Sequence, residues 1–225
     1  MTGYHEPVLL RESVEALVTD PNGIYVDVTF GGGGHSGEIL RRLGKNGKLI
    51  AFDQDEDAEK NKPDDKRFML IRSNFRYMKN FLRYHDLIPV NGVLADLGIS
   101  SHQIDTAERG FSTRFDASLD MRMNNKAEVT AGDVINSYPE EKLSGLFKEF
   151  SDLREAKNIA RKIVARRTQK AINTTTELLE ILKTEARPGH EFQFFAKVFQ
   201  ALRIEVNREP EALKERSEEH TSELQ

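Results

Sequence analysis

The chain has 225 residues, a formal net charge of −4, 38% hydrophobic and 31% charged residues, which is typical of one large globular domain or one domain carrying an insertion. Its apolar runs are short and interrupted by charges, which excludes a membrane-spanning helix, and its first residues lack the basic and apolar regions of a signal peptide. The absence of cysteine excludes disulfides and thiolate metal sites, the scattered histidines favour no metal site of any kind, and a reducing compartment, the cytoplasm, is predicted.

The first half of the chain alternates short apolar strands with helical segments. Strands are predicted at residues 24–30, 48–53, 67–72 and 92–97, where β-branched and aromatic residues gather after turn signals. Helices are predicted at residues 38–43 and 75–84. This alternation predicts a parallel sheet that helices cover on both faces.

The second half of the chain has an irregular segment followed by a helical pattern. Residues 98–125 follow neither a helical nor a strand period, and a loop of this length is usually functional or disordered. From about Thr130 the pattern is helical, and capping boxes are predicted at Ser137 with Glu140 and at Thr174 with Glu177. Apolar residues at helical spacing predict packed helix faces in this half.

The last ten residues, 216–225 (RSEEHTSELQ), have no apolar period. They resemble a translated sequencing adapter, so we predict a non-native tail on a chain cut off near Glu215, with the sheet left incomplete. The alternative is a genuine polar C-terminus.

A run of four glycines, Gly31 to Gly34, separates the first predicted strand from the first predicted helix. Glycine lets the backbone approach a ligand closely, and the spacing fits G-x-G-x-x-G without the Lys of a P-loop. Asp53 closes the next strand, where a carboxylate can accept hydrogen bonds from both ribose hydroxyls. The pattern predicts an adenosine-ribose site that suits NAD and S-adenosylmethionine equally, and the alternative is a merely flexible loop.

Two further carboxylates favour the methyl donor. Asp27 lies at the end of the first predicted strand, where it could help to place a cationic amino-acid group, which NAD lacks. Asp96 ends the fourth predicted strand, at the edge where α/β sheets bind ligands. The alternative for Asp96 is an ordinary cap at a strand end.

Several stretches together carry a resemblance to a known family. They are residues 5–10 (HEPVLL), 23–36 (GIYVDVTFGGGGHS), 49–55 (LIAFDQD), 95–105 (ADLGISSHQID), 108–123 (ERGFSTRFDASLDMRM) and 199–207 (FQALRIEVN). In this order they resemble the bacterial methyltransferases that modify the N4 amine of a cytidine in the decoding region of 16S ribosomal RNA. The segment ERGFS…LDMRM has no general chemical meaning, so its match is highly specific. The chain departs from the family at His102, where Pro is common, and at residues 190–198 (HEFQFFAKV).

The resemblance implies S-adenosylmethionine as cofactor and a Rossmann-like α/β fold with an inserted α-helical domain. The parallel sheet of that fold would be incomplete here, since this sequence supplies about four of its strands. It implies a methyltransferase domain at residues 1–115 and 203–215 and a substrate-recognition insertion at residues 116–202. The partner would be 16S rRNA in the small ribosomal subunit, and no membrane association is expected. The oligomeric state stays open, and a homodimer is one of the possibilities. Carried over to matching positions, the cofactor site consists of Gly33, Gly34, His35, Asp53, Phe75, Asp96 and Gln103. The alternative for His35 is a helix-start cap without ligand contact.

Catalysis and RNA binding need further groups. Asp96 is the candidate catalytic residue, as the hydrogen-bond acceptor for the cytosine amine. The target base has to leave its stack, and aromatic or arginine side chains of the long loop could receive it and its phosphates; the candidates are Arg109, Phe111, Arg114, Phe115 and Arg122. Both Phe rings could instead anchor the loop to the core.

A basic segment at residues 154–170 contains seven Lys or Arg and one acid, Glu155. A basic patch on an acidic protein suits an RNA backbone, with Arg161 and Arg166 as the candidate contacts, and the alternative is a solvated helix face. Two other functions stay open on the residues alone. One is an NAD-dependent Rossmann oxidoreductase, and the other is a non-catalytic RNA-binding module in ribosome assembly.

Overall fold

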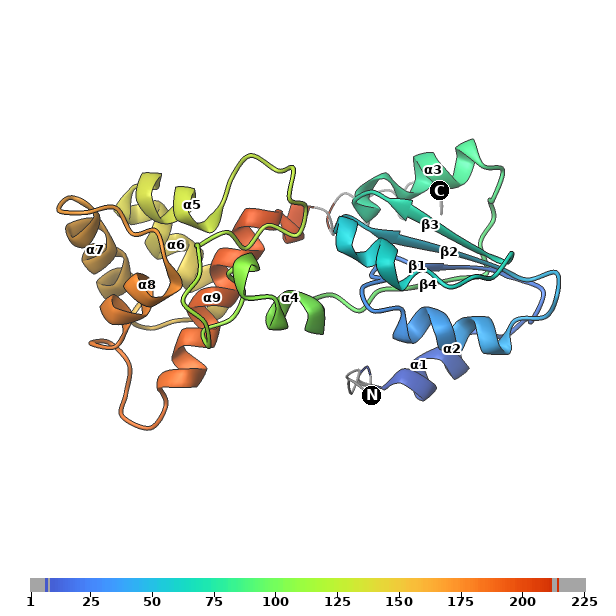
Figure 1. Ribbon diagram of the computed structural model, residues 1–225, viewed down its shortest axis with the longest axis horizontal. Helices are drawn as coiled ribbons and strands as arrows, with labels where there is room; N and C mark the ends of the chain where they lie inside the picture. Colours follow the sequence, from blue (N-terminus) through green and yellow to red (C-terminus); the bar gives the residue numbers. More distant parts are fainter. Residues whose placement is uncertain (1–6, 8, 212–213, 215–225) are drawn as a thin grey trace. The chain divides into compact units, whose positions relative to one another are not determined.

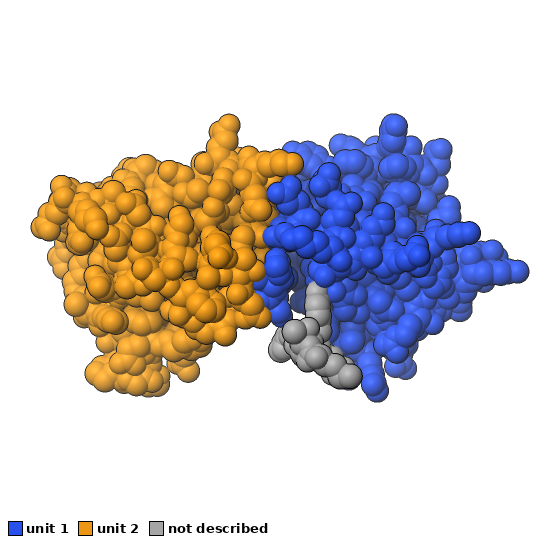
Figure 2. Space-filling view, viewed as in Figure 1, with its two compact units in different colours: residues 1–102, 212–225 blue, residues 103–211 orange. Residues whose placement is uncertain are grey.

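The computed structural model describes residues 7, 9–211 and 214, and it divides the chain into two compact units (Figure 1, Figure 2). The first contains the described residues up to His102 together with Lys214, and the second runs from Gln103 to Glu211. Residues 103–115 and 203–211, which the sequence assigns to the methyltransferase domain, therefore pack within the helical unit. The functional assignment of the domains stays a prediction, and the tail at 216–225 lies outside the described residues.

The first unit contains a parallel sheet of four strands, which are β1 (Ile24–Asp27), β2 (Lys48–Asp53), β3 (Phe68–Arg72) and β4 (Gly92–Leu94). Their order is β3-β2-β1-β4, so the chain moves to one side of β1 first and then to the other. This reversal leaves a switch point between β1 and β4, where open α/β sheets bind ligands. The predicted α/β class and parallel sheet are confirmed.

Helices cover both faces of this sheet. Helices α1 (Leu10–Leu17) and α2 (Gly34–Arg42) lie on one face, and α3 (Met78–Tyr84) lies on the other (Figure 1). Two short 3-10 helices, η1 (Glu56–Asn61) and η2 (Phe75–Tyr77), follow β2 and β3. The predicted helix at 75–84 is thus a 3-10 turn that continues into α3, and the predicted helix at 38–43 starts earlier, inside the glycine run.

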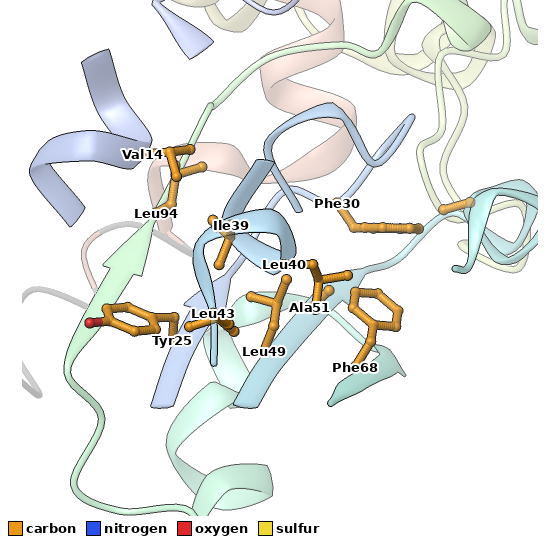
Figure 3. Close-up of a cluster of buried hydrophobic side chains, with 11 residues drawn as sticks. Val14, Tyr25, Phe30, Ile39, Leu40, Leu43, Leu49, Ala51, Phe68 and Leu94 are labelled. Carbon is orange, nitrogen blue, oxygen red and sulfur yellow. The ribbon is translucent and has the colours of Figure 1, made fainter. Parts of the chain in front are cut away.

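Two hydrophobic clusters hold the layers together. Figure 3 shows the cluster between the sheet and α1 and α2, to which β1 contributes Tyr25 and α2 contributes Ile39. Val26, the next residue of β1, belongs to the cluster under α3 together with Met78. Neighbouring side chains of a strand point to opposite faces, so β1, buried on both faces, is almost uniformly apolar up to Asp27.

The second unit is helical. It contains most of α4 (Ser101–Asp105), a 3-10 turn η3 (Ala107–Arg109), α5 (Ala131–Ser137), α6 (Glu140–Ser151), α7 (Ala156–Arg167), α8 (Thr175–Leu182) and α9 (Glu191–Asn207). The predicted apolar stripes are buried here, with Leu143, Phe147 and Leu182 at 0% exposure. In the part of the chain that the structure describes, no helix has the length and apolarity needed to cross a membrane.

The capping boxes of this unit only partly match the prediction. Thr174 and Glu177 form the predicted box at the start of α8. The box predicted at Ser137 is wrong, because Ser137 ends α5 and its hydroxyl donates to the carbonyl of Asp133, while Pro139 precedes α6. An unforeseen box joins Thr130 and Asp133 at the start of α5. A local S-x-x-E pattern cannot tell a helix end from a helix start when two helices follow each other closely.

Candidate active site

The glycine loop bends sharply between β1 and α2. Gly31 and Gly33 have positive φ angles of 49° and 78°, a region that favours glycine. Gly33 precedes the first residue of α2, and its N–H donates to the carbonyl of Phe30 over 2.8 Å. A side chain on Gly34 would collide with Pro7. The predicted loop residues Gly33, Gly34 and His35 therefore form the first turn of α2 and its cap.

Asp53 braces this loop from the end of β2. Its Oδ2 accepts the N–H of Gly31 over 2.8 Å, and its Oδ1 accepts the N–H of Asp55 over 2.8 Å. On the other side, Asn61 of η1 donates its side-chain N–H to the carbonyl of Gly31 over 3.0 Å. Burial raises the pKa of Asp53 to about 6, although the hydrogen bonds from Asp55 and Gly31 oppose that rise. Asp53 thus holds the loop and keeps further acceptor capacity, since each carboxylate oxygen can accept two hydrogen bonds.

Asp27 lies deeper, with 0% exposure at the end of β1. Its Oδ2 accepts the hydroxyl of Ser36 over 2.7 Å, and its Oδ1 accepts the backbone N–H of Thr29 over 3.0 Å. Burial raises the pKa of Asp27, against the effect of these hydrogen bonds. The sequence suggested that Asp27 could place a cationic group of the ligand, but its contacts tie the start of α2 to the end of β1.

Asp96 follows β4 and reaches the surface, where its side chain is 56% exposed. Its backbone N–H donates to the hydroxyl oxygen of Thr29 over 2.8 Å. His35, which is buried at 7% exposure, has its Nδ1 3.7 Å from the Oδ2 of Asp96. The structure therefore brings Asp96 and His35 together across the switch point between β1 and β4, an arrangement that the chain order alone did not reveal.

Phe75 lies at the end of β3 as the first residue of η2. It is half-buried and packs against the hydrophobic cluster under α3. The neighbouring Asn74 caps η2 and donates to the side chain of Gln54 over 3.2 Å, which joins the ends of β3 and β2. Gln103, the remaining predicted cofactor residue, is 5% exposed and belongs to the second unit.

Three of the side chains predicted to contact RNA are buried or bonded to other groups of the second unit. Arg109 is 7% exposed and donates to the carbonyls of Arg122 and Met123 over 2.9 and 3.1 Å. Arg122 forms an ion pair with Asp120, and Phe111 is 6% exposed. These placements favour packing roles for all three side chains, and RNA contact by them stays a prediction.

The distinctive segment ERGFS…LDMRM forms an internal brace with the end of α9. Asn207 accepts the N–H of Met123 over 2.7 Å and donates to the carbonyl of Met121 over 2.8 Å. The N–H of Met121 donates to the carbonyl of Arg109 over 3.0 Å. Asn207 lies in the matching segment FQALRIEVN, but nothing in its local pattern announced this contact. The specificity of both segments thus has a structural basis.

The basic side chains of the segment around α7 differ in how far ion pairs and hydrogen bonds within the unit occupy them. Lys162 pairs with Glu185, Lys170 pairs with Glu177, and Arg167 donates to two backbone carbonyls. Arg161 is exposed, and Arg166 is half-buried beside the carbonyl of Lys170. Two further basic side chains are exposed: Lys157 lies on α7, and Arg154 lies just before it. The surface that this segment offers to an anion is smaller than its sequence suggests.

No metal site emerges from the residues that the structure describes, because no three His, Asp or Glu side chains among them are placed to share an ion.

Comparison with known proteins identifies close relatives. The sequence model of the MraW methylase family matches residues 2–225. The chain is 58% identical over 214 residues to the ribosomal RNA small subunit methyltransferase H of Bacteroides fragilis strain YCH46, which covers 95% of this chain and 70% of the relative. It is 57% identical to the protein of that name from Christiangramia forsetii, with 94% and 70% covered, and 56% identical to that from Cytophaga hutchinsonii, with 94% and 72% covered.

Proposed function

The chain belongs to the MraW methylase family, and from this membership we propose that it is a ribosomal RNA methyltransferase that uses S-adenosylmethionine. Its proposed substrate is the exocyclic N4 amine of a cytidine in the decoding region of 16S rRNA, within the small ribosomal subunit. The named relatives support a small-subunit RNA as substrate. A ribosomal substrate also implies the cytoplasm as the compartment, and a homodimer is one of the assemblies open to the protein.

The observation that carries the choice of cofactor is the use of the glycine loop. In dinucleotide-binding proteins such a loop directs backbone N–H groups at a pyrophosphate. Here the N–H of Gly31 already donates to Asp53, and Asp96 adds an exposed carboxylate just beyond the neighbouring strand β4. These two carboxylates disfavour a pyrophosphate at the loop and favour a ligand with positive charge, which S-adenosylmethionine carries on its sulfonium and amino groups. The NAD-dependent oxidoreductase is therefore not favoured.

The residues of the first unit fit this cofactor by their chemistry. Asp53 has acceptor capacity left for the ribose hydroxyls, and Phe75 offers an aromatic face at the neighbouring strand end for the adenine. Gly33, Gly34 and His35 line the turn between them and Asp96. When bound, S-adenosylmethionine supplies an activated methyl group, so the protein has mainly to orient the acceptor.

Asp96 is the residue that we propose to orient that acceptor. The lone pair of the cytosine amine is delocalised into the ring, so the amine is a poor nucleophile. A carboxylate that accepts its N–H hydrogen bond aligns the nitrogen and takes up positive charge that develops on it. Asp96 is exposed enough to meet a substrate and lies beside the proposed cofactor site. Exposed Arg161 and half-buried Arg166 are proposed to contact the RNA backbone.

The first experiment is a calorimetric titration of the protein, in parallel, with S-adenosylmethionine and with NAD, followed by methyl transfer to a 16S rRNA fragment that contains the decoding region. Binding of the first ligand alone, with methyl transfer to cytidine N4, supports the proposal. Binding of NAD alone contradicts it. Binding of S-adenosylmethionine and RNA without any transfer would favour the non-catalytic assembly module.

The role of Asp96 is tested separately with Asp96→Asn. The amide has the size of the carboxylate but lacks its charge, so we expect the fold to persist and single-turnover methylation at saturating S-adenosylmethionine to slow by about a hundredfold, the usual contribution of such a group. An unchanged single-turnover rate would rule out this role.

A further inference from the structure

Thr29 occupies the connection between β1 and the glycine loop, at the switch point of the sheet. We propose that Thr29 is a positioning residue, whose hydroxyl sets the location of Asp96 for methyl transfer. The inference rests on the proposed function. It extends that function by a residue that is proposed to act through Asp96, without touching the methyl donor or the cytosine amine.

The hydroxyl of Thr29 is held between two acidic residues. It accepts the backbone N–H of Asp96 over 2.8 Å, and it lies 3.4 Å from the Oδ1 of Asp27, to which it donates. The backbone N–H of Thr29 donates to the same Oδ1 over 3.0 Å. Since Asp27 is 0% exposed and is also bound by Ser36, Thr29 is fixed to a part of the fold that has little freedom to move.

Asp96 lies beyond the last paired residue of its strand. Strand β4 ends at Leu94, whose carbonyl accepts the N–H of Val28 over 2.9 Å, and regular pairing stops there. The hydrogen bond from Asp96 to Thr29 continues the connection between β1 and β4 beyond the ladder. Among the residues that the structure describes, His35 also approaches Asp96, but its Nδ1 lies 3.7 Å from the carboxylate, beyond hydrogen-bond distance. The direction in which Asp96 leaves the sheet therefore depends on the Thr29 hydroxyl.

Displacement of a reacting group by about 1 Å can lower a rate by about a hundredfold, so a residue that sets this position affects turnover without touching the substrate. The same residue should have little effect on cofactor affinity, because the brace from Asp53 and Asn61 to Gly31 does not include it. Positioning thus predicts a fall in kcat with KM for S-adenosylmethionine nearly constant.

The test compares Thr29→Val, which keeps the shape and removes the hydroxyl, with Thr29→Ser, which keeps the hydroxyl. We expect Thr29→Val to lower kcat by about tenfold or more with KM for S-adenosylmethionine changed less than about twofold, and Thr29→Ser to keep a kcat close to wild type. If Thr29→Val does not fold, as judged by thermal unfolding, Thr29→Ala replaces it in the same comparison. Thr130→Val, which removes a hydroxyl cap from α5 far along the chain, is the control for general loss of stability and should keep its kcat.

A double mutant tests whether Thr29 acts through Asp96. In the Asp96→Asn background no carboxylate is left to position, so Thr29→Val should lower the single-turnover rate by less than about twofold. The inference would be overturned if Thr29→Val lowered the rate equally in both backgrounds, or if Thr29→Val kept a wild-type kcat. It would also be overturned if Thr29→Ser were slow, or if Thr29→Val raised KM in place of lowering kcat. Absence of methyl transfer by the wild-type protein would instead contradict the proposed function, so the two failures are distinguishable.

Discussion

The two units use their polar side chains in opposite ways. In the first unit, Asp53 and Asp96 lie at or just beyond strand ends, where Asp53 accepts backbone N–H groups of the loop, and the exposed carboxylate of Asp96 keeps acceptor capacity toward the surface. In the second unit, Arg109 and Asn207 form hydrogen bonds with backbone carbonyl and N–H groups inside the unit. A charged residue in a distinctive motif is therefore no guide to ligand contact by itself, and its hydrogen-bond partners decide between a binding and a structural role.

The largest effect expected concerns the stability of the second unit. Arg109→Met removes a buried guanidinium and leaves the carbonyls of Arg122 and Met123 without that donor, so the free energy of unfolding should fall by about 3 kcal/mol. Urea unfolding measures the change. The matched control is Arg114→Met in the same loop, where the arginine pairs with Asp105 at the surface and should contribute less than about 1 kcal/mol. Equal losses in both variants would remove the distinction between the buried and the exposed arginine.

The next effect concerns the cofactor site of the first unit. Asp53→Asn replaces a charged acceptor with a neutral one, and we expect the Kd for S-adenosylmethionine to rise by about thirtyfold, which corresponds to about 2 kcal/mol. Calorimetric titration measures it. Asp64→Asn, an exposed carboxylate of the same unit, is the control and should bind as wild type does. An unchanged Kd in Asp53→Asn would show that this carboxylate braces the loop without serving the ligand.

The pH dependence of binding sharpens the same point. Since burial raises the pKa of Asp53 to about 6, the carboxylate that accepts ribose hydroxyls is lost as the pH falls through 6, and affinity should drop about tenfold between pH 7 and pH 5. The free energy of unfolding should change in the opposite direction, so that it rises as the pH falls from 7 to 5. A pKa raised above the ordinary value means that the folded protein binds the proton more tightly, so protonation of Asp53 stabilises the fold below pH 6, and this contribution is lost as the pH rises through 6.

Titrations and urea unfolding at pH 5, 6 and 7 would measure both trends, with Asp53→Asn as the variant that should lack them. If affinity and stability changed together in wild type, or if Asp53→Asn kept the same pH profile, a different group would control binding.

The smallest effect expected is at the exposed charges of α7. Arg161→Glu should weaken binding of the 16S rRNA fragment by about threefold to tenfold and reduce the salt dependence by about one unit of slope, because one phosphate contact is lost. Fluorescence anisotropy at several salt concentrations measures both. Lys45→Glu makes the same charge change at an exposed position of the first unit and should bind nearly as wild type does. Equal losses in both variants would indicate a response to net charge in place of a localised contact.

The sequence by itself determined the α/β class, the parallel sheet and the family. Short apolar strands alternating with helices leave few other arrangements, and β2 spans the predicted residues, Lys48 to Asp53. The glycine run and Asp53 also pointed to the cofactor edge, because the carboxyl ends of parallel strands share one edge. Family membership followed from segments whose exact residues have few alternatives.

Only the tertiary structure decided which polar groups meet. Thr29 and Asp96 are 67 positions apart, and Met123 and Asn207 are 84 apart, so no local pattern relates them. Periodicity reports which face of an element is buried, and capping patterns report where a helix can begin, but neither sets the register of a sheet or the path of a long loop. Hydrogen bonds depend on distances within a few tenths of an ångström, which the packed fold alone supplies. For that reason the sequence located the cofactor edge, while the structure separated the residues that brace it from those that are free to bind.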